Sequence, residues 1–123
     1  MKKILIVDDH ADIRRLIRMT LEFEDYAIEE AADGESALRV AQAMQPDLVL
    51  LDVMMPGPVN GLEVCRRLRA GATASGPRVI MLSARGHASD REAGLQAGAD
   101  TYLVKPFSPL QLINGIAQLW AAA

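Results

Sequence analysis

Acidic, hydroxyl and basic side chains directly follow four separate apolar runs of the sequence, and their types suit phosphate chemistry. Asp8 and Asp9 follow the first run, Asp52 follows a second, and Ser83 and Lys105 follow two more. Carboxylate oxygens are ligands that Mg²⁺ accepts, and a lysine can act as a point charge on phosphoryl oxygens. If the runs are strands of one open parallel sheet, these side chains share the edge where ligands bind. The pattern predicts a Mg²⁺-dependent phosphoryl site.

Three carboxylates in one pocket repel one another and need a cation. Once Mg²⁺ lowers that repulsion, a carboxylate such as Asp52 can attack phosphorus and form an aspartyl phosphate. Lys105 is then the countercharge on the phosphoryl oxygens. Positioning and charge neutralisation are predicted to account for most of the reactivity.

The strands that would carry these residues are five short runs, which are Ile4–Val7, Ala27–Ala31, Leu48–Leu51, Val79–Leu82 and Tyr102–Val104. Segments whose apolar residues fall three and four positions apart alternate with them, which predicts five helices and an α/β fold. The second run is the most polar, as an edge strand would be. The fourth helix, about Ser89–Ala97, has a thin apolar face interrupted by Gly94 and is expected to be marginal and mobile.

Length and composition indicate one domain over residues 1–123 and exclude several classes of protein. Half of the residues are hydrophobic, which is enough for a core. A net charge of −3 disfavours direct binding of nucleic acid. The apolar run after Met1-Lys2-Lys3 is too short for a signal peptide or a membrane span. The single cysteine, Cys65, agrees with a reducing environment, and a cytoplasmic location is expected.

Four stretches together resemble the response-regulator receiver domain of two-component signalling, and the resemblance covers essentially the whole chain. They are ILIVDDH, LLDVMMPG with NGLEVCRRLR, VIMLSA, and GADTYLVKPF. The resemblance implies a flavodoxin-like, doubly wound parallel sheet of five strands in the order 2-1-3-4-5 with five helices. It also implies that Asp52 is the phosphoacceptor, Asp9 a direct Mg²⁺ ligand and Asp8 an acid-pocket partner. The backbone carbonyl of Met54 would be a further metal ligand.

The same resemblance assigns roles to residues of the last two strands. Ser83 would bond the phosphoryl group, Lys105 would pair with it, and Tyr102 would be an aromatic switch. On phosphorylation, Ser83 would move toward the phosphoryl group and Tyr102 would rotate inward to fill the vacated space. The bond between Lys105 and Pro106 is expected to be cis.

Structural interpretations compete with these roles. Asp8 and Asp9 could cap the following helix, Ser83 could cap another, and Tyr102 could be core. His10 is interpreted as a solvated residue that tunes the pocket, outside the site itself. Asp33 is expected to be an N-cap.

The sequence departs from the family pattern in one loop, since the spacing from Asp52 to Gly61 is one residue longer than usual. The extra residue follows Met54, so the carbonyl that faces the metal should survive. The shape of the loop near Pro58 and Val59 is left open.

The predicted function is a phosphorylation-controlled switch rather than an enzyme. Its phosphodonor would be a histidine kinase or a histidine phosphotransfer protein, and its target a downstream protein or an output domain absent from this chain. An alternative is a Mg²⁺-dependent phosphohydrolase with an aspartyl-phosphate intermediate, but such enzymes commonly carry a second acid where this chain has Met54. A flavin-binding protein would need a Ser/Thr-rich loop in place of Asp8-Asp9-His10.

Overall fold

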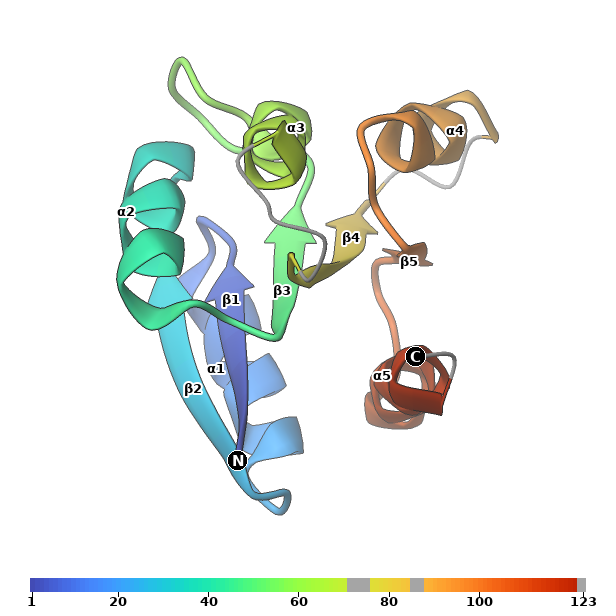
Figure 1. Ribbon diagram of the computed structural model, residues 1–123. Coiled ribbons are helices and arrows are strands. Elements are labelled where there is room, and N and C mark those ends of the chain that lie inside the picture. Colours follow the sequence, from blue (N-terminus) through green and yellow to red (C-terminus); the bar gives the residue numbers. More distant parts are fainter. Residues whose placement is uncertain (71–75, 85–87, 122–123) are drawn as a thin grey trace.

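One parallel sheet lies between two layers of helices in the computed structural model, which describes residues 1–70, 76–84 and 88–121 (Figure 1). The strands are β1 (Lys2–Val7), β2 (Tyr26–Ala31), β3 (Leu48–Asp52), β4 (Arg78–Ser83) and β5 (Thr101–Val104). The helices are α1 (Ala11–Leu21), α2 (Gly34–Met44), α3 (Gly61–Ala70), α4 (Ala88–Gln96) and α5 (Pro109–Ala121). The strand order is β2-β1-β3-β4-β5 and every pairing is parallel. The predicted fold class and strand order are confirmed.

Alternate residues of the central strands enter two separate cores. On β1, Leu5 and Val7 belong to the core that α2 and α3 cover, whereas Ile4 and Ile6 belong to the core that α1 and α5 cover. Both faces of these strands are apolar because helices cover both faces. In β1 and β3 the buried stretch is wholly apolar, so polar side chains stand only at the ends of these strands.

The edge position of β2 agrees with its polar sequence. Glu30 of this strand pairs with Arg14 and Arg18 of α1, at 3.0 Å and 2.6 Å. These ion pairs join α1 to the edge strand of the sheet.

Within the described residues, no helix has the length and apolar character that a membrane span requires.

Side-chain caps and turns mark the ends of several elements, and the predicted N-cap Asp33 is among them. Asp33 caps α2, since its carboxylate accepts a hydrogen bond from the backbone N–H of Ser36 at 2.7 Å. Asp47, before β3, accepts one from the N–H of Lys3 at 2.8 Å. Gly98 follows α4 with φ of +108°, a left-handed conformation that favours glycine.

The loop between β3 and α3, which carries the extra residue, folds back onto the start of α2. Val59 is buried there, and a Cβ atom at Gly34 would lie only 2.1 Å from the carbonyl oxygen of Val59. The close approach is possible because residue 34 has no side chain. A cavity of about 340 Å³ lies between residues 33–35 and 56–59. The extra residue is thus accommodated away from Asp52.

Candidate functional site

Asp8 and Asp9 follow directly after β1, at the edge formed by the carboxyl ends of the strands. Asp8 is fully buried, and its Oδ1 accepts a hydrogen bond from the N–H of His10 at 2.9 Å while Oδ2 accepts one from Lys105 Nζ at 2.6 Å. Asp9 is partly exposed, but its Oδ1 is buried and has no hydrogen bond within the described residues. A buried carboxylate oxygen without a donor suits a metal ligand.

Asp52 is the last residue of β3 and only 3% exposed. Its Oδ1 lies 3.4 Å from Lys105 Nζ and accepts a long hydrogen bond, also 3.4 Å, from the N–H of Met54. The chain returns closely behind it, because a Cβ atom at Gly61 would lie 2.1 Å from the carbonyl oxygen of Asp52. A small residue at the start of α3 therefore fixes the loop that aims this carboxylate.

The pKa of Asp52 is raised from 3.8 to about 6, mainly because the carboxyl is buried and also because of the nearby charge of Asp8. The ammonium of Lys105 and the N–H of Met54 offset part of this effect. Asp52 is therefore ionised at neutral pH, at an energetic cost that a cation in the pocket would relieve.

Lys105 and Ser83 reach the same edge from β5 and β4. Ser83 is buried and follows Leu82, which is the register partner of Asp52 in the adjacent strand. The backbone N–H of Lys105 donates to the carbonyl of Ser83 at 2.7 Å, which joins the two strand ends. The Lys105-Pro106 bond is cis, as predicted.

Tyr102 and Met54 differ in how far they are buried. Tyr102 is already buried, with its ring beside Gly94 of α4, where a Cβ atom would lie 3.3 Å from Cδ2 of the tyrosine. Gly94 leaves room for the ring at this position. Met54 is 53% exposed and contributes its N–H to Asp52.

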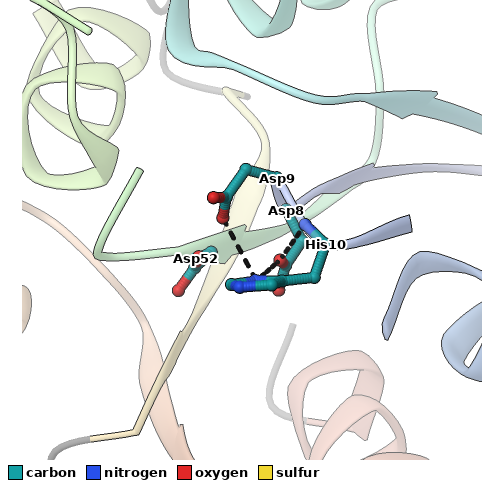
Figure 2. A group of neighbouring side chains, drawn as sticks. All are labelled: Asp8, Asp9, His10 and Asp52. Carbon is teal, nitrogen blue, oxygen red and sulfur yellow. Dashed lines mark hydrogen bonds and ion pairs between the residues drawn. The ribbon is translucent and has the colours of Figure 1, made fainter. Parts of the chain in front are cut away.

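His10, which the sequence-based hypothesis placed outside the site, and Arg14, which it did not consider, both contact the site. His10 Nδ1 lies 3.0 Å from Asp8 Oδ1 and 3.2 Å from Asp9 Oδ1 (Figure 2), and its hydrogen bond to Asp8, with the charge of Asp9, raises the pKa of His10. Arg14 donates to the carbonyl of Asp8 at 2.7 Å. The position of His10 beside the acid pair was a usable signal, whereas nothing in the sequence tied Arg14 to Asp8.

The donor set can hold a metal ion. One ligand atom each from Asp8, Asp9, His10 and Asp52 lies within 4.8 Å of the others (Figure 2). Three of the four residues offer hard carboxylate oxygens, and one of these oxygens lacks any hydrogen-bond donor within the described ranges. Such a set fits Mg²⁺, which takes one or two carboxylates and completes its shell with water and phosphate.

Comparison with known proteins agrees with this geometry. The family model described as the response regulator receiver domain matches residues 4–117. The chain belongs to this receiver family. Receiver domains take part in two-component signal transduction and interact with histidine kinases, and an Mg²⁺ site and an aspartyl phosphate are typical of them.

Relatives of the receiver domain include full-length transcriptional regulators. This chain is 50% identical over 117 residues to the transcriptional regulatory protein ResD of Bacillus subtilis. The aligned residues make up 95% of this chain and 47% of ResD. It is 47% identical over 111 residues to the response regulator MprA of Mycolicibacterium vanbaalenii, over 90% of this chain and 47% of MprA. The chain therefore spans about half the length of these relatives.

Solved receiver structures share the whole fold. The chemotaxis protein CheY4 of Vibrio cholerae superposes with a TM-score of 0.88 at 34% identity, over 96% of this chain and 98% of that one. The BeF3-activated receiver domain of RstA from Klebsiella pneumoniae superposes with a TM-score of 0.86 at 29% identity, over 95% and 97% of the two chains.

Proposed function

We propose that this receiver domain accepts a phosphoryl group onto Asp52 from the phosphohistidine of a histidine kinase or a histidine phosphotransfer protein. The observation that carries the proposal is the position of Asp52, buried between the ammonium of Lys105 and the acid pair Asp8-Asp9. A carboxylate oxygen of Asp52 attacks phosphorus, the P–N bond breaks, and the imidazole of the donor leaves.

The other groups of the pocket position the reactants. Mg²⁺, when held by Asp9, Asp52 and the carbonyl of Met54 with Asp8 beside them, supplies charge neutralisation for the phosphoryl oxygens. Lys105 lies close enough to both Asp8 and Asp52 to transfer its ion pair to a phosphoryl oxygen.

Labelling with acetyl phosphate tests this proposal directly. The protein is incubated with acetyl phosphate, with and without Mg²⁺, and the phosphoryl group is detected by intact-protein mass spectrometry. Wild type and the matched control Asp25→Asn, an exposed aspartate directly before β2, should label only with Mg²⁺. Asp52→Asn should not label. Equal labelling of Asp52→Asn and wild type would show that Asp52 is not the nucleophile.

The domain is proposed to be a switch, with self-catalysed phosphoryl acceptance and slow autodephosphorylation as its only chemistry. Met54 stands two residues after Asp52, where a second acid would serve a phosphohydrolase as general acid and base. The aspartyl phosphate should therefore persist. Repeated turnover of a phosphoester by the purified protein would instead support the alternative, a Mg²⁺-dependent phosphohydrolase.

Ser83 is proposed to couple phosphorylation to the surface that partners contact. Its hydroxyl would contact a phosphoryl oxygen in one conformational state only, and a ligand shifts an equilibrium by such differential contacts. When Ser83 moves toward the phosphoryl group, we expect Tyr102 to rotate into the space that it leaves and α4, which packs beside the ring, to repack. The recipient is a downstream protein or an output domain.

The binding of beryllofluoride with Mg²⁺ tests the role of Ser83. Wild type and Ser83→Ala should both bind this phosphoryl mimic, but only wild type should show large amide shifts in α4 and β5. Equal shifts in the two proteins would exclude Ser83 as the coupling residue.

A further inference from the structure

Arg14 of α1 contacts the site through the backbone rather than through a carboxylate of the pocket. Its Nη1 donates a hydrogen bond to the carbonyl oxygen of Asp8 at 2.7 Å, and its Nε donates to the carboxylate of Glu30 at 3.0 Å. Only 19% of the Arg14 side chain is exposed. One guanidinium thus joins the first acid of the pocket to the edge strand β2.

The carbonyl that Arg14 holds belongs to the peptide bond between Asp8 and Asp9. This peptide is planar, so the direction of its carbonyl determines how the backbone turns from one acid to the next. The turn lies between the end of β1 and the start of α1, and the N-cap of that helix, His10, makes no side-chain capping bond within the described part of the chain. The orientation of the two acids therefore depends on contacts from other elements, of which the bond from Arg14 is short and charge-assisted.

Glu30 keeps the guanidinium in place and also binds a second arginine. Its two carboxylate oxygens accept from Arg14 and from Arg18, at 3.0 Å and 2.6 Å. Arg18 directs another nitrogen to the carbonyl of Ile28 in β2, at 3.3 Å. The two arginines therefore share a counterion and a charge, and they differ in the carbonyl that each one holds.

We propose that Arg14 is a positioning residue for phosphoryl transfer, which orients the peptide between Asp8 and Asp9 so that both carboxylates serve the Mg²⁺ site. This inference rests on the proposed function, because it concerns the Mg²⁺ site that the transfer uses. Loss of a group that orients metal ligands without touching the metal commonly lowers metal affinity by about 10- to 100-fold.

The charge of Arg14 has the opposite effect on Mg²⁺, since two cations repel each other. Removal of Arg14 would tighten Mg²⁺ binding if only its charge mattered, and would weaken binding if it orients the acids. The sign of the change therefore distinguishes the two roles.

Isothermal titration calorimetry with Mg²⁺ on Arg14→Met and the matched control Arg18→Met tests the proposal. Methionine keeps an unbranched apolar stem and removes the charge and the hydrogen bonds. The dissociation constant should rise by about 10-fold in Arg14→Met and stay unchanged in Arg18→Met. Equal weakening in the two variants would overturn the proposal, because the shared contact with Glu30 would then explain it. Unchanged or tighter binding by Arg14→Met would overturn it as well.

Arg14→Lys is a milder variant for the case in which Arg14→Met does not fold. It keeps the charge, but an ammonium lacks the planar fork that reaches Glu30 and the carbonyl of Asp8 together. Mg²⁺ should bind this variant more weakly than wild type, and equal affinity would contradict the proposal.

A measurement without metal separates failure of this inference from failure of the proposed function. In EDTA, the amide of His10, which donates to Asp8 Oδ1 at 2.9 Å, should exchange with solvent faster in Arg14→Met than in wild type or Arg18→Met. Equal exchange in the three proteins would overturn the role of Arg14 whether or not Mg²⁺ binds. If the exchange differs as expected but acetyl phosphate does not label Asp52, the proposed function fails while the orientation of the acids by Arg14 is supported.

Discussion

Replacing Asp52 by Asn should stabilise the domain at neutral pH but not at acidic pH. In the folded protein the pKa of this carboxyl is about 6, and its ordinary value is 3.8. Each tenfold change in proton affinity is worth about 1.4 kcal/mol, so ionised Asp52 costs the folded state up to about 3 kcal/mol. Relaxation of the pocket reduces this figure, and we expect a gain of about 2 kcal/mol.

The sign of the pH dependence follows from proton binding. Below the ordinary pKa of aspartate, Asp52 is protonated in both states and contributes nothing. As pH rises toward 6, the unfolded chain loses this proton while the folded protein keeps it, so stability falls. Above pH 6 the carboxyl is ionised in both states and the full cost remains. Asp52→Asn removes this cost, so the two proteins should differ at about pH 7.5 and agree at about pH 3.5.

Urea unfolding in EDTA at these two pH values measures the effect. The control Asp25→Asn, at an exposed position, should match wild type at both. A gain of equal size at acidic and neutral pH would refute the electrostatic explanation, since it would then reflect packing or hydrogen bonding. Mg²⁺ should narrow the gap at neutral pH, because it binds the folded wild type more tightly than the variant.

Three further predictions concern other parts of the molecule. Asp9→Ala should lose most Mg²⁺ affinity by calorimetry, yet in EDTA its melting temperature should be no lower than that of wild type, because a repulsive charge has gone. Asp100→Ala should lower the free energy of unfolding in urea by about 2 to 3 kcal/mol, since Oδ2 of Asp100 accepts hydrogen bonds from Arg69 at 2.5 Å and from the N–H of Val79 at 2.7 Å. A loss below about 0.5 kcal/mol would mean that water replaces the carboxylate as hydrogen-bond acceptor. Gly61→Ala should slow labelling by acetyl phosphate and lower the free energy of unfolding by about 1 to 3 kcal/mol, because the added Cβ would displace the Asp52 carbonyl. Unchanged labelling would show that the loop adjusts without moving the carboxylate.

Much of the fold was predictable because apolar runs and helical periods are local signals. The ends of the strands were also predictable, and with them the convergence of Asp8, Asp52 and Lys105 on one edge. The strand order came from family resemblance, since periodicity does not say which strands are neighbours.

The features that the sequence did not predict depend on contacts between distant elements. Arg14 reaches the carbonyl of Asp8, and Arg69 reaches Asp100 across 31 positions of the chain. Such partners cannot be identified until the helices are docked on the sheet. The burial of Tyr102 likewise depends on the packing of α4, through the space that Gly94 leaves.

The two apolar faces of each central strand have a consequence for how the strands find their register. In a sheet with one solvent-exposed face, shifting the register of a strand by one residue turns its hydrophobic side chains toward solvent. The hydrophobic pattern alone then specifies the register. Here Ile6 and Val7 of β1 are both buried, on opposite faces, so a slip would exchange one apolar side chain for another at little cost in burial. It would, however, draw Asp8 into the sheet interior as a charge without its lysine, which is far costlier. The acids that suit phosphate chemistry thus also oppose a register shift of β1 during folding. Selection for the site therefore also maintains the register of the sheet.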